Sequence, residues 1–323
     1  MKCFVTGGSG FIGTHLIGYL ANRGLELKIL KHRRPINLNK VDKKTKKIEI
    51  IEGDIKNKDL LEKGLNEIDV VFHLAAAMAS ESISEKKFYE INVIGTKNLL
   101  DASLKNNVKR FVHVSSAGVL GTVVGMIADE TYPLSPMDSY ERTKAEAEKV
   151  CREYITKEMD VIIVRPGWVY GPEDKRIYRL IEAIKNGYFF MIGNGENLQT
   201  PVYVDDLING IFLTYEKGKN GEIYNIAGDE ILSIKDMILT IYRVLEKESE
   251  PVNVPLWLGK ICSWLSQNAF KPLGIDIPLN KSSIGFFIKN KPLSIEKAKN
   301  HLNYSPKIKF SEGIKNLINI NQH

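Results

Sequence analysis

The chain has 323 residues, of which 43% are hydrophobic and 26% charged, and its formal net charge is +6. This composition suits a globular protein with a full apolar core and excludes a disordered or collagen-like chain. The cysteines Cys3, Cys151 and Cys262 are few and far apart, so we predict no disulfide framework. The histidines lack metal-ligand spacing, so we expect no metal site. We also expect no signal peptide, no integral membrane segment and a reducing, cytoplasmic location.

Short apolar runs alternate with amphipathic stretches in the N-terminal half. The expected strands are Lys2–Thr6, Leu27–Leu30, Ile48–Ile51, Val70–Leu74, Phe111–Ser115 and Val161–Arg165. The expected helices are Phe11–Asn22, Lys58–Leu65, Phe88–Lys105 and Tyr140–Lys157. Strand–helix alternation of this kind predicts right-handed βαβ units. We therefore predict an α/β fold in which residues 1–171 form a Rossmann-type, doubly wound parallel sheet.

The alternation loosens beyond Gly171. The expected elements are helices at Ile177–Asn186, Asp205–Glu216 and Ser233–Leu245, a short strand pair around Phe189–Ile192 and Pro201–Val204, and a strand at Glu222–Ile226. We expect residues 172–323 to form a smaller C-terminal α/β substrate-binding cap, with segments such as 200–227 returning to the first domain. The apolar stretch Val254–Leu265 could line a greasy pocket, rest on a membrane surface or cover the core as an amphipathic helix.

A glycine loop joins the first strand to the first helix. Gly7, Gly10 and Gly13 recur at every third position. The first allows a tight turn, the second lets the backbone approach a pyrophosphate, and the third lets the helix pack on the sheet. The helix N-terminus, at Phe11 and Ile12, attracts the phosphate charge. These five residues are the predicted core of a dinucleotide site.

The end of the second strand indicates which dinucleotide binds. An acidic residue there would accept from a ribose hydroxyl and favour NAD. The sequence instead has Lys31 and Arg33 within a basic cluster, which suits the 2′-phosphate of NADP. A solvated basic loop is the alternative interpretation, and under it NAD is the cofactor. No nucleic-acid motif accompanies the cluster, and we expect no nucleic acid as a partner.

Further motifs follow in the same order along nearly the whole chain. They are Thr6–Gly13, Gly53-Asp54-Ile55, His73-Leu74-Ala75-Ala76, Asn92, Ser115–Gly121, Tyr140-Glu141-Arg142-Thr143-Lys144, Arg165–Pro172 and Val204-Asp205-Asp206. Together they resemble the extended short-chain dehydrogenase/reductase superfamily, in its NAD-dependent epimerase/dehydratase group. The resemblance implies that Asp54, Ile55, Leu74, Ala75, Ala76 and Pro166 lie along the cofactor. The sequence departs from the family pattern at Leu120, where Tyr is usual.

Ser116, Tyr140 and Lys144 are the predicted catalytic residues. Tyr140 and Lys144 are four residues apart on one helix face. A neighbouring ammonium stabilises a phenolate, so Lys144 would lower the pKa of Tyr140 and let it act as general acid and base. Ser116 would orient the substrate oxygen, while hydride passes between the substrate carbon and the nicotinamide. Tyr140 and Lys144 are also predicted to bind the cofactor, and the resemblance implies that Lys144 holds its ribose. The buried-strand residues His73 and His113 are expected to be satisfied core histidines.

The substrate class is predicted from positions where nucleotide-sugar enzymes of this superfamily carry arginine. Relatives that bind nucleotide sugars carry an Arg where this chain has Gln199, and a second Arg where it has only Lys289 and Lys291. We therefore favour a reductase or dehydrogenase of a non-nucleotide ketone or alcohol. The alternatives are a nucleotide-sugar epimerase or dehydratase with transient cofactor reduction, and a non-catalytic dinucleotide-sensing or RNA-binding protein. The resemblance also implies a homodimer formed by the Phe88–Lys105 and Tyr140–Lys157 helices.

Overall fold

The computed structural model describes residues 1–42, 47–78, 83–248, 250–265 and 281–320. Seven parallel strands form one sheet in the order β3-β2-β1-β4-β5-β6-β11. They are β1 (Lys2–Thr6), β2 (Glu26–Lys31), β3 (Ile48–Glu52), β4 (Val70–His73), β5 (Arg110–Val114), β6 (Val161–Pro166) and β11 (Ile223–Ile226). The strand order reverses between β1 and β4, which is where a doubly wound sheet opens a crevice at its carboxyl edge. The predicted Rossmann-type fold is confirmed.

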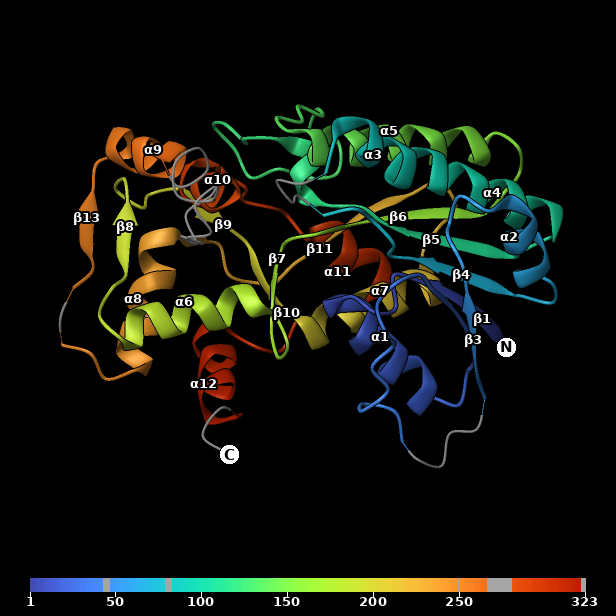
Figure 1. Ribbon diagram of the computed structural model, residues 1–323, viewed down its shortest axis with the longest axis horizontal. Helices are drawn as coiled ribbons and strands as arrows, with labels where there is room; N and C mark the ends of the chain where they lie inside the picture. The colour runs from blue at the N-terminus through green and yellow to red at the C-terminus, as the bar shows by residue number, and fades with distance from the viewer. Residues whose placement is uncertain (43–46, 79–82, 249, 266–280, 321–323) are drawn as a thin grey trace.

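Helices cover both faces of this sheet (Figure 1). One layer contains α1 (Phe11–Asn22), α7 (Val204–Lys217) and α11 (Glu296–Leu302), and the other contains α2 (Lys58–Gly64), α4 (Gly95–Lys105) and α5 (Ser139–Ile155). A short helix α3 (Glu85–Tyr89) and a π-helical turn (Glu90–Ile94) lead into α4. Successive strand residues face opposite layers, so Phe4 packs in one buried apolar cluster and Val5 in the other. This burial on both faces explains why the strands read as continuous apolar runs.

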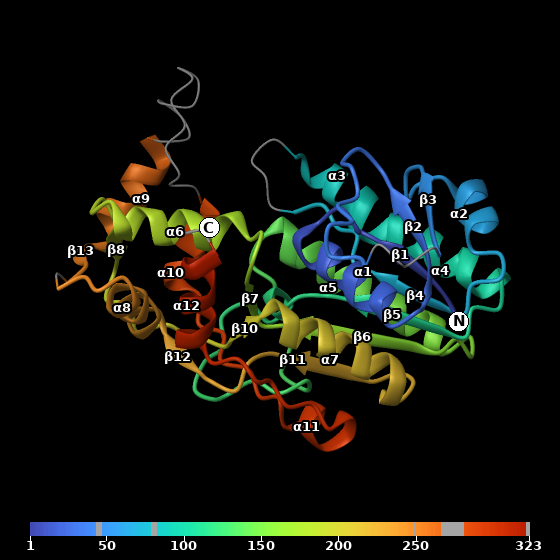
Figure 2. The ribbon, with the colours of Figure 1, turned by 90° about the horizontal axis from the view of Figure 1, so that it is seen from below.

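The C-terminal segments other than α7, α11 and β11 lie beside the sheet rather than over it, as Figures 1 and 2 show. The helices of these segments are α6 (Lys175–Lys185), α8 (Ile234–Val244), α9 (Leu256–Leu265), α10 (Lys281–Ile288) and α12 (Phe310–Ile320). The strand pairs are β7 (Trp168–Tyr170) with β10 (Pro201–Tyr203), β8 (Phe190–Ile192) with β13 (Val252–Val254), and β9 (Leu198–Gln199) with β12 (Leu232–Ser233).

Two features of the C-terminal half differ from the sequence prediction or extend it. The expected pairing of 189–192 with 201–204 is wrong, because β10 lies beside β7, which follows directly on β6, and β8 finds its partner in the distant β13. In addition, β11 completes the large sheet beside β6, and α7 packs on α1. The chain therefore returns to the sheet after its first excursion.

Within the described ranges, no helix is long and apolar enough to cross a bilayer. The same part of the chain holds no group of three or more His, Cys, Asp or Glu side chains arranged to bind a metal ion.

Candidate functional site

The glycine loop lies against the carboxyl end of β4. Gly7 has φ +75°, and a Cβ on it would come within 2.6 Å of the Ala75 backbone nitrogen. A Cβ on Gly13 would lie 2.1 Å from the Gly7 carbonyl oxygen. Only glycine allows this close packing, which places the first turn of α1, with its amides at Phe11 and Ile12, at the mouth of the crevice. A cradle of this shape fits the pyrophosphate of a nicotinamide dinucleotide.

A chain of buried hydrogen bonds fixes the turn after β4. The Ala75 amide donates to Thr6 Oγ1 at 3.2 Å, and the Thr6 hydroxyl donates to His73 Nδ1 at 2.7 Å. His73 Nε2 donates in turn to Thr96 Oγ1 at 2.8 Å, whose hydroxyl donates to the Asn92 carbonyl at 2.6 Å. Burial lowers the pKa of His73 to about 3, so its ring is neutral. His73 is thus a satisfied core residue, as predicted.

The basic residues expected at a 2′-phosphate have different surroundings. Lys31 ends β2, and its Nζ forms an ion pair with Glu52, its register partner on β3. Arg33 is exposed. Glu52, which the sequence analysis left without a role, therefore lies beside Lys31 and offsets its charge. Of the two predicted cations, Arg33 is the one that is exposed and outside this ion pair.

The remaining predicted cofactor residues lie along the carboxyl edge of the sheet. Asp54, just after β3, accepts from the Lys56 amide at 3.0 Å and lies 3.6 Å from His32 Nε2. Ile55 is buried and packs against Gly95 of α4, so its side chain belongs to the core. The other members of this group are the half-buried Leu74, Ala75 and Ala76 after β4, and Pro166 at the end of β6.

Ser116 and Tyr140 meet where β5 ends and α5 begins. Ser116 caps a short 3-10 turn, and its Oγ accepts from the Gly118 amide at 3.0 Å. Tyr140 lies in the first turn of α5 and is half-buried. Burial raises the pKa of Tyr140 to about 12, while hydrogen bonding to Ser116 and the charge of Arg176 act to lower it. The phenol is therefore protonated at neutral pH in the protein as it stands.

Lys144 lies one helical turn further along α5 and is almost fully buried. Its Nζ donates to the Val114 carbonyl oxygen at 2.8 Å and lies 3.4 Å from His113 Nε2. Burial lowers the pKa of Lys144 to about 8, partly countered by Cys151 and Glu148. The three predicted catalytic residues thus lie near the carboxyl end of β5, two strands away from β1 and its glycine loop.

His113 is buried as predicted, but its hydrogen bonding differs from the prediction. Its ring is fully buried on β5, next to His73 with ring centroids 5.2 Å apart. Within the described residues its Nδ1 has no hydrogen-bond partner. His113 is therefore a buried histidine, but it is not a fully satisfied one, because its partner is the Lys144 ammonium rather than a pair of hydroxyls.

A buried ion pair supports the strand that precedes Ser116. Arg165 on β6 donates to Glu148 of α5 through Nε at 3.0 Å and Nη2 at 2.7 Å, and the two side chains are 1% and 0% exposed. Ser115 Oγ donates to the same carboxylate at 2.6 Å. The pair is bidentate and hydrogen-bonded on a third side, which is the geometry that makes buried charges tolerable. It ties β5, β6 and α5 together next to the site.

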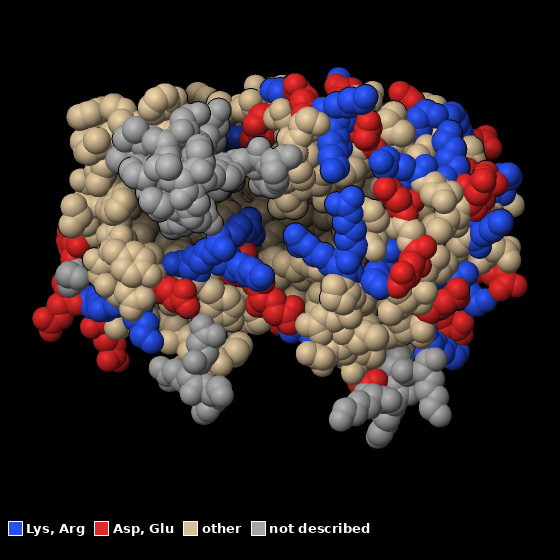
Figure 3. Space-filling model, viewed as in Figure 1, with Lys and Arg blue, Asp and Glu red and all other residues tan. Residues whose placement is uncertain are grey.

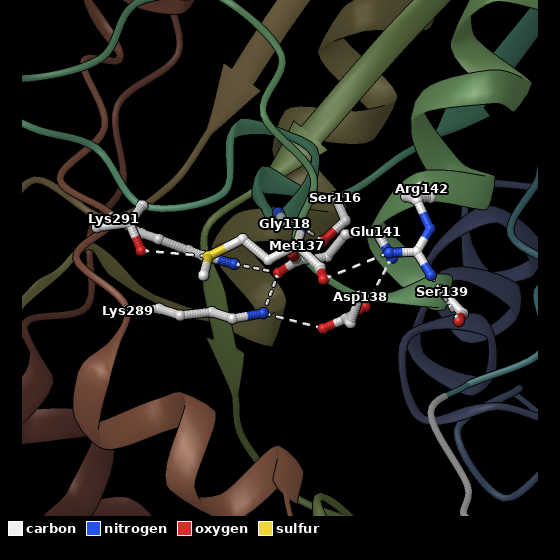
Figure 4. Close-up of polar contacts among 10 residues, drawn as sticks. Ser116, Gly118, Met137, Asp138, Ser139, Glu141, Arg142, Lys289 and Lys291 are labelled. Atoms are coloured by element: carbon white, nitrogen blue, oxygen red, sulfur yellow. Dashed lines mark hydrogen bonds and ion pairs between the residues drawn. The ribbon is translucent and has the colours of Figure 1, made fainter.

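Two lysines of the C-terminal segment reach the first turn of α5 (Figure 4). Lys289 Nζ and Lys291 Nζ donate to Glu141 Oε1 at 2.8 and 2.9 Å, and Lys289 also reaches Asp138 Oδ2 at 2.9 Å. We call Asp138, Glu141, Lys289 and Lys291 the lysine latch. It contains two positive and two negative groups, so the lysine charges are balanced inside the protein. The sequence analysis noted the lysines but could not identify their partners.

Gln199 is also occupied within the fold. Its side chain is buried, and its Nε2 donates to the Lys289 carbonyl oxygen at 2.8 Å. The Lys291 amide donates to the Leu198 carbonyl at 2.7 Å, so β9 and the segment 289–291 run side by side. These two bonds anchor the segment that carries both lysines. Gln199 thus holds the segment 289–291, and Lys289 and Lys291 join that segment to the first turn of α5.

A hollow separates the two halves of the molecule on the face drawn in Figure 3, with Lys and Arg side chains at its rim. The C-terminal half contains an aromatic cluster: Trp168 of β7 stacks on Tyr170 with centroids 5.8 Å apart and contacts Phe286 of α10 with centroids 5.3 Å apart.

The apolar stretch 254–265 forms the end of β13 and helix α9. Trp257 is 64% exposed and Ile261 is 47% exposed, whereas Gly259 packs on Ile192. The helix α9 therefore has one packed side and one exposed apolar side.

The comparisons with known proteins agree with this geometry. Residues 3–227 match the model of the NAD dependent epimerase/dehydratase family. A farnesyl-dihydroquinoline-oxide ketoreductase of Stigmatella aurantiaca is 26% identical over 322 residues, covering 97% of this chain and 95% of that protein. The decarboxylating sterol-4-alpha-carboxylate 3-dehydrogenase of Mus musculus is 27% identical, covering 100% of this chain and 91% of that protein.

A solved structure extends the match to the whole fold. The dTDP-glucose 4,6-dehydratase of Streptomyces venezuelae, with NAD bound, superposes with a TM-score of 0.80 at 27% identity, covering 100% of this chain and 97% of that chain. The glycine cradle and the reversal of strand order at β1 and β4 are the features of this chain that suit such a fold. The chain belongs to the NAD dependent epimerase/dehydratase family.

Proposed function

We propose that this protein is an NAD(P)-dependent reductase or dehydrogenase of a non-nucleotide ketone or alcohol. The observation that carries the proposal is the lysine latch. Both lysines donate to Glu141, and Lys289 also donates to Asp138. The Gln199 amide donates to the Lys289 carbonyl. A nucleoside diphosphate would have to break these buried contacts to find cations there, and lysines lack the bidentate fork of arginine. An uncharged substrate needs no such rearrangement.

In this proposal the chain's own residues move one proton and hold the substrate oxygen. Bound NAD(P)H would supply the hydride to the carbonyl carbon. Ser116 donates a hydrogen bond to the carbonyl oxygen, and Tyr140 transfers its hydroxyl proton to that oxygen as the alcohol forms. The charged Lys144 stabilises the tyrosinate that remains until a solvent proton restores the phenol. In the reverse direction the same groups remove the proton from an alcohol.

The names of the relatives support an apolar substrate, and one of them supports the alternative, a nucleotide sugar. The Stigmatella ketoreductase is named for a farnesylated substrate and the mouse enzyme for a sterol, whereas the Streptomyces enzyme is named for a nucleotide sugar. We propose an apolar substrate for this chain, like those in the first two names, because the charges of the lysine latch balance one another. A nucleotide-sugar epimerase or dehydratase is the second candidate, favoured by the likeness to the nucleotide-sugar enzyme over the full chain.

For the cofactor we propose a preference for NADP that depends on Arg33. The family and the solved relative indicate a nicotinamide dinucleotide. Lys31 contributes less than its sequence position suggested, because Glu52 pairs with it and would repel a 2′-phosphate. Arg33 is exposed and outside that ion pair, and its guanidinium is suited to bind a phosphate.

We also propose a homodimer formed through α4, α5 and the π-helical turn before α4. A groove of about 600 Å³ runs between α3, this turn and α5, lined by residues that include Tyr89, Arg142 and Glu146. Ile94 and Leu104 expose apolar side chains on the same helical layer. Light scattering on the purified protein tests this proposal, and a monomer at micromolar concentration contradicts it.

Melting temperatures with added ligands separate the two candidate functions. The protein is saturated with NADP and scanned with UDP, dTDP, GDP and CDP, and the shift caused by NADP alone serves as the control that the assay reports binding. A nucleotide at a hundred times its dissociation constant adds about 2.7 kcal/mol, a shift of roughly 5–10 °C for a chain of this size. We expect no shift from any of them, together with NADPH oxidation by apolar ketones. A clear shift with one nucleotide overturns the proposal and identifies the carrier of a sugar substrate.

A further inference from the structure

Two histidines lie in neighbouring buried strands next to the site, and they differ in their hydrogen bonds. His73 on β4 and His113 on β5 are register partners in neighbouring strands, and both are buried. His73 has threonine hydroxyls at both ring nitrogens. His113 has the Lys144 ammonium 3.4 Å from Nε2 and, within the described residues, nothing at Nδ1.

The chemistry of the two groups fixes the direction of the His113 contact. An ammonium has three protons and no lone pair, so His113 Nε2 has to be the acceptor and the ring proton has to lie on Nδ1. That leaves a buried N–H without a partner among the described residues, an arrangement that disfavours folding. Core packing alone does not account for a histidine here, because an apolar side chain would fill the same space without an unpaired donor.

We propose that His113 is a positioning residue for Lys144. Its Nε2 accepts one ammonium proton while the Val114 carbonyl accepts a second at 2.8 Å, and the third proton stays available at the catalytic edge. This inference rests on the proposed role of Lys144 beside Tyr140. The neutral acceptor also favours the charged form of Lys144 against the burial that lowers its pKa to about 8.

Other groups near Lys144 keep their own contacts when His113 is substituted. They are Tyr140, Glu148 and Cys151 on the same helix, His73 on β4, and Arg165 on β6, which is paired with Glu148. Burial raises the pKa of Cys151, so its thiol is neutral, and the charge of Glu148 is shared with Arg165. His113 is therefore the neutral side-chain acceptor of Lys144, and a substitution can remove it, unlike the Val114 carbonyl.

Three variants test the proposal in the cofactor-free protein. His113→Leu removes the acceptor, and His113→Gln replaces it with an amide oxygen. His73→Leu is the matched control, since it removes the neighbouring buried ring without removing a hydrogen bond to Lys144. Lysine side chains are labelled with ¹³C at Cε, the Lys144 signal is assigned by its loss in Lys144→Arg, and its titration is followed by NMR.

We expect the Lys144 titration midpoint to fall by about one pH unit in His113→Leu, to recover in part in His113→Gln, and to stay unchanged in His73→Leu. The free energy of unfolding should fall more in His73→Leu than in His113→Leu, the reverse of the order for the titration midpoint. His73→Leu leaves two threonine hydroxyls without their ring partner, whereas His113→Leu removes an unpaired donor, and this gain offsets the acceptor that Lys144 loses, so His73→Leu should unfold more easily than His113→Leu. An unchanged midpoint in His113→Leu, or an equal fall in His73→Leu, overturns the inference.

Turnover gives a second readout once a ketone substrate is known. Because the charged form of Lys144 is the active one, the alkaline limb of the kcat profile should move down with the NMR midpoint. A fall of one pH unit from about 8 lowers the charged fraction at pH 8 about fivefold, and kcat with it. Failure to find any ketone turnover would count against the proposed function alone, since the NMR titration needs neither cofactor nor substrate.

Discussion

Glu141→Gln tests the lysine latch, the contact between residues 289–291 and the first turn of α5. The side chain of Glu141 is 4% exposed, and those of Lys289 and Lys291 are 14% and 16% exposed. Glutamine keeps the size of the side chain and an acceptor for the Met137 amide, which is bonded at 2.9 Å, but it removes the charge. Lys289 keeps Asp138 as a partner, so Lys291 is the cation left without its carboxylate.

Breaking a buried ion pair by removing one partner costs about 3–5 kcal/mol. We expect the lower end, about 3 kcal/mol, because the amide oxygen of glutamine still accepts a hydrogen bond. The melting temperature should fall by roughly 6–12 °C, and the urea midpoint should fall with it. Since Glu141 adjoins Tyr140, kcat should also fall more than KM changes.

The matched variant is Glu141→Gln/Lys291→Met, which removes the unpaired cation and keeps most of its apolar stem. It should recover most of the stability lost in Glu141→Gln, because a buried pair replaced by neutral groups is often tolerated. Equal urea midpoints for Glu141→Gln and the wild type, or a double variant no more stable than Glu141→Gln, would refute the reasoning.

Four further outcomes are expected. Tyr140→Phe should abolish turnover and leave NADP affinity within about twofold by titration calorimetry, since the phenol donates only the proton; retained turnover contradicts its role. Gly7→Ala should lose cofactor binding, because its Cβ would meet the Ala75 nitrogen at 2.6 Å, and unchanged binding would refute the cradle. Arg33→Ala should weaken NADP binding more than NAD binding, and an equal loss would remove the basis for the NADP proposal. The free energy of unfolding should decrease as the pH falls below about 6.5. In the unfolded chain His73 then binds a proton, whereas in the folded protein, where its pKa is about 3, it stays neutral. From about pH 7.5 to about pH 5.5 this difference costs about 1.4 kcal/mol, which urea midpoints measure against His73→Leu, and an equal pH dependence in the two proteins would contradict it.

The sequence by itself determined the parts of the molecule that depend on neighbours along the chain. The apolar strand runs, the glycine spacing at Gly7 to Gly13 and the four-residue separation of Tyr140 and Lys144 all reflect local geometry, and the structure has each of them in the expected element. Strand periodicity, turn sterics and helix pitch are properties of a few consecutive residues, so they can be read without the fold.

Only the tertiary structure decided which distant residues meet. Lys289 and Lys291 lie 148 and 150 residues beyond Glu141, and β8 pairs with β13 rather than with a strand close to it in the sequence. Lys31 acquires Glu52 as a partner, and His113 acquires Lys144, through the register of strands and the packing of α5. Such contacts depend on how whole elements dock. A local pattern predicts that a residue is buried or charged, but the partner that balances its charge is fixed by the packing of the complete chain.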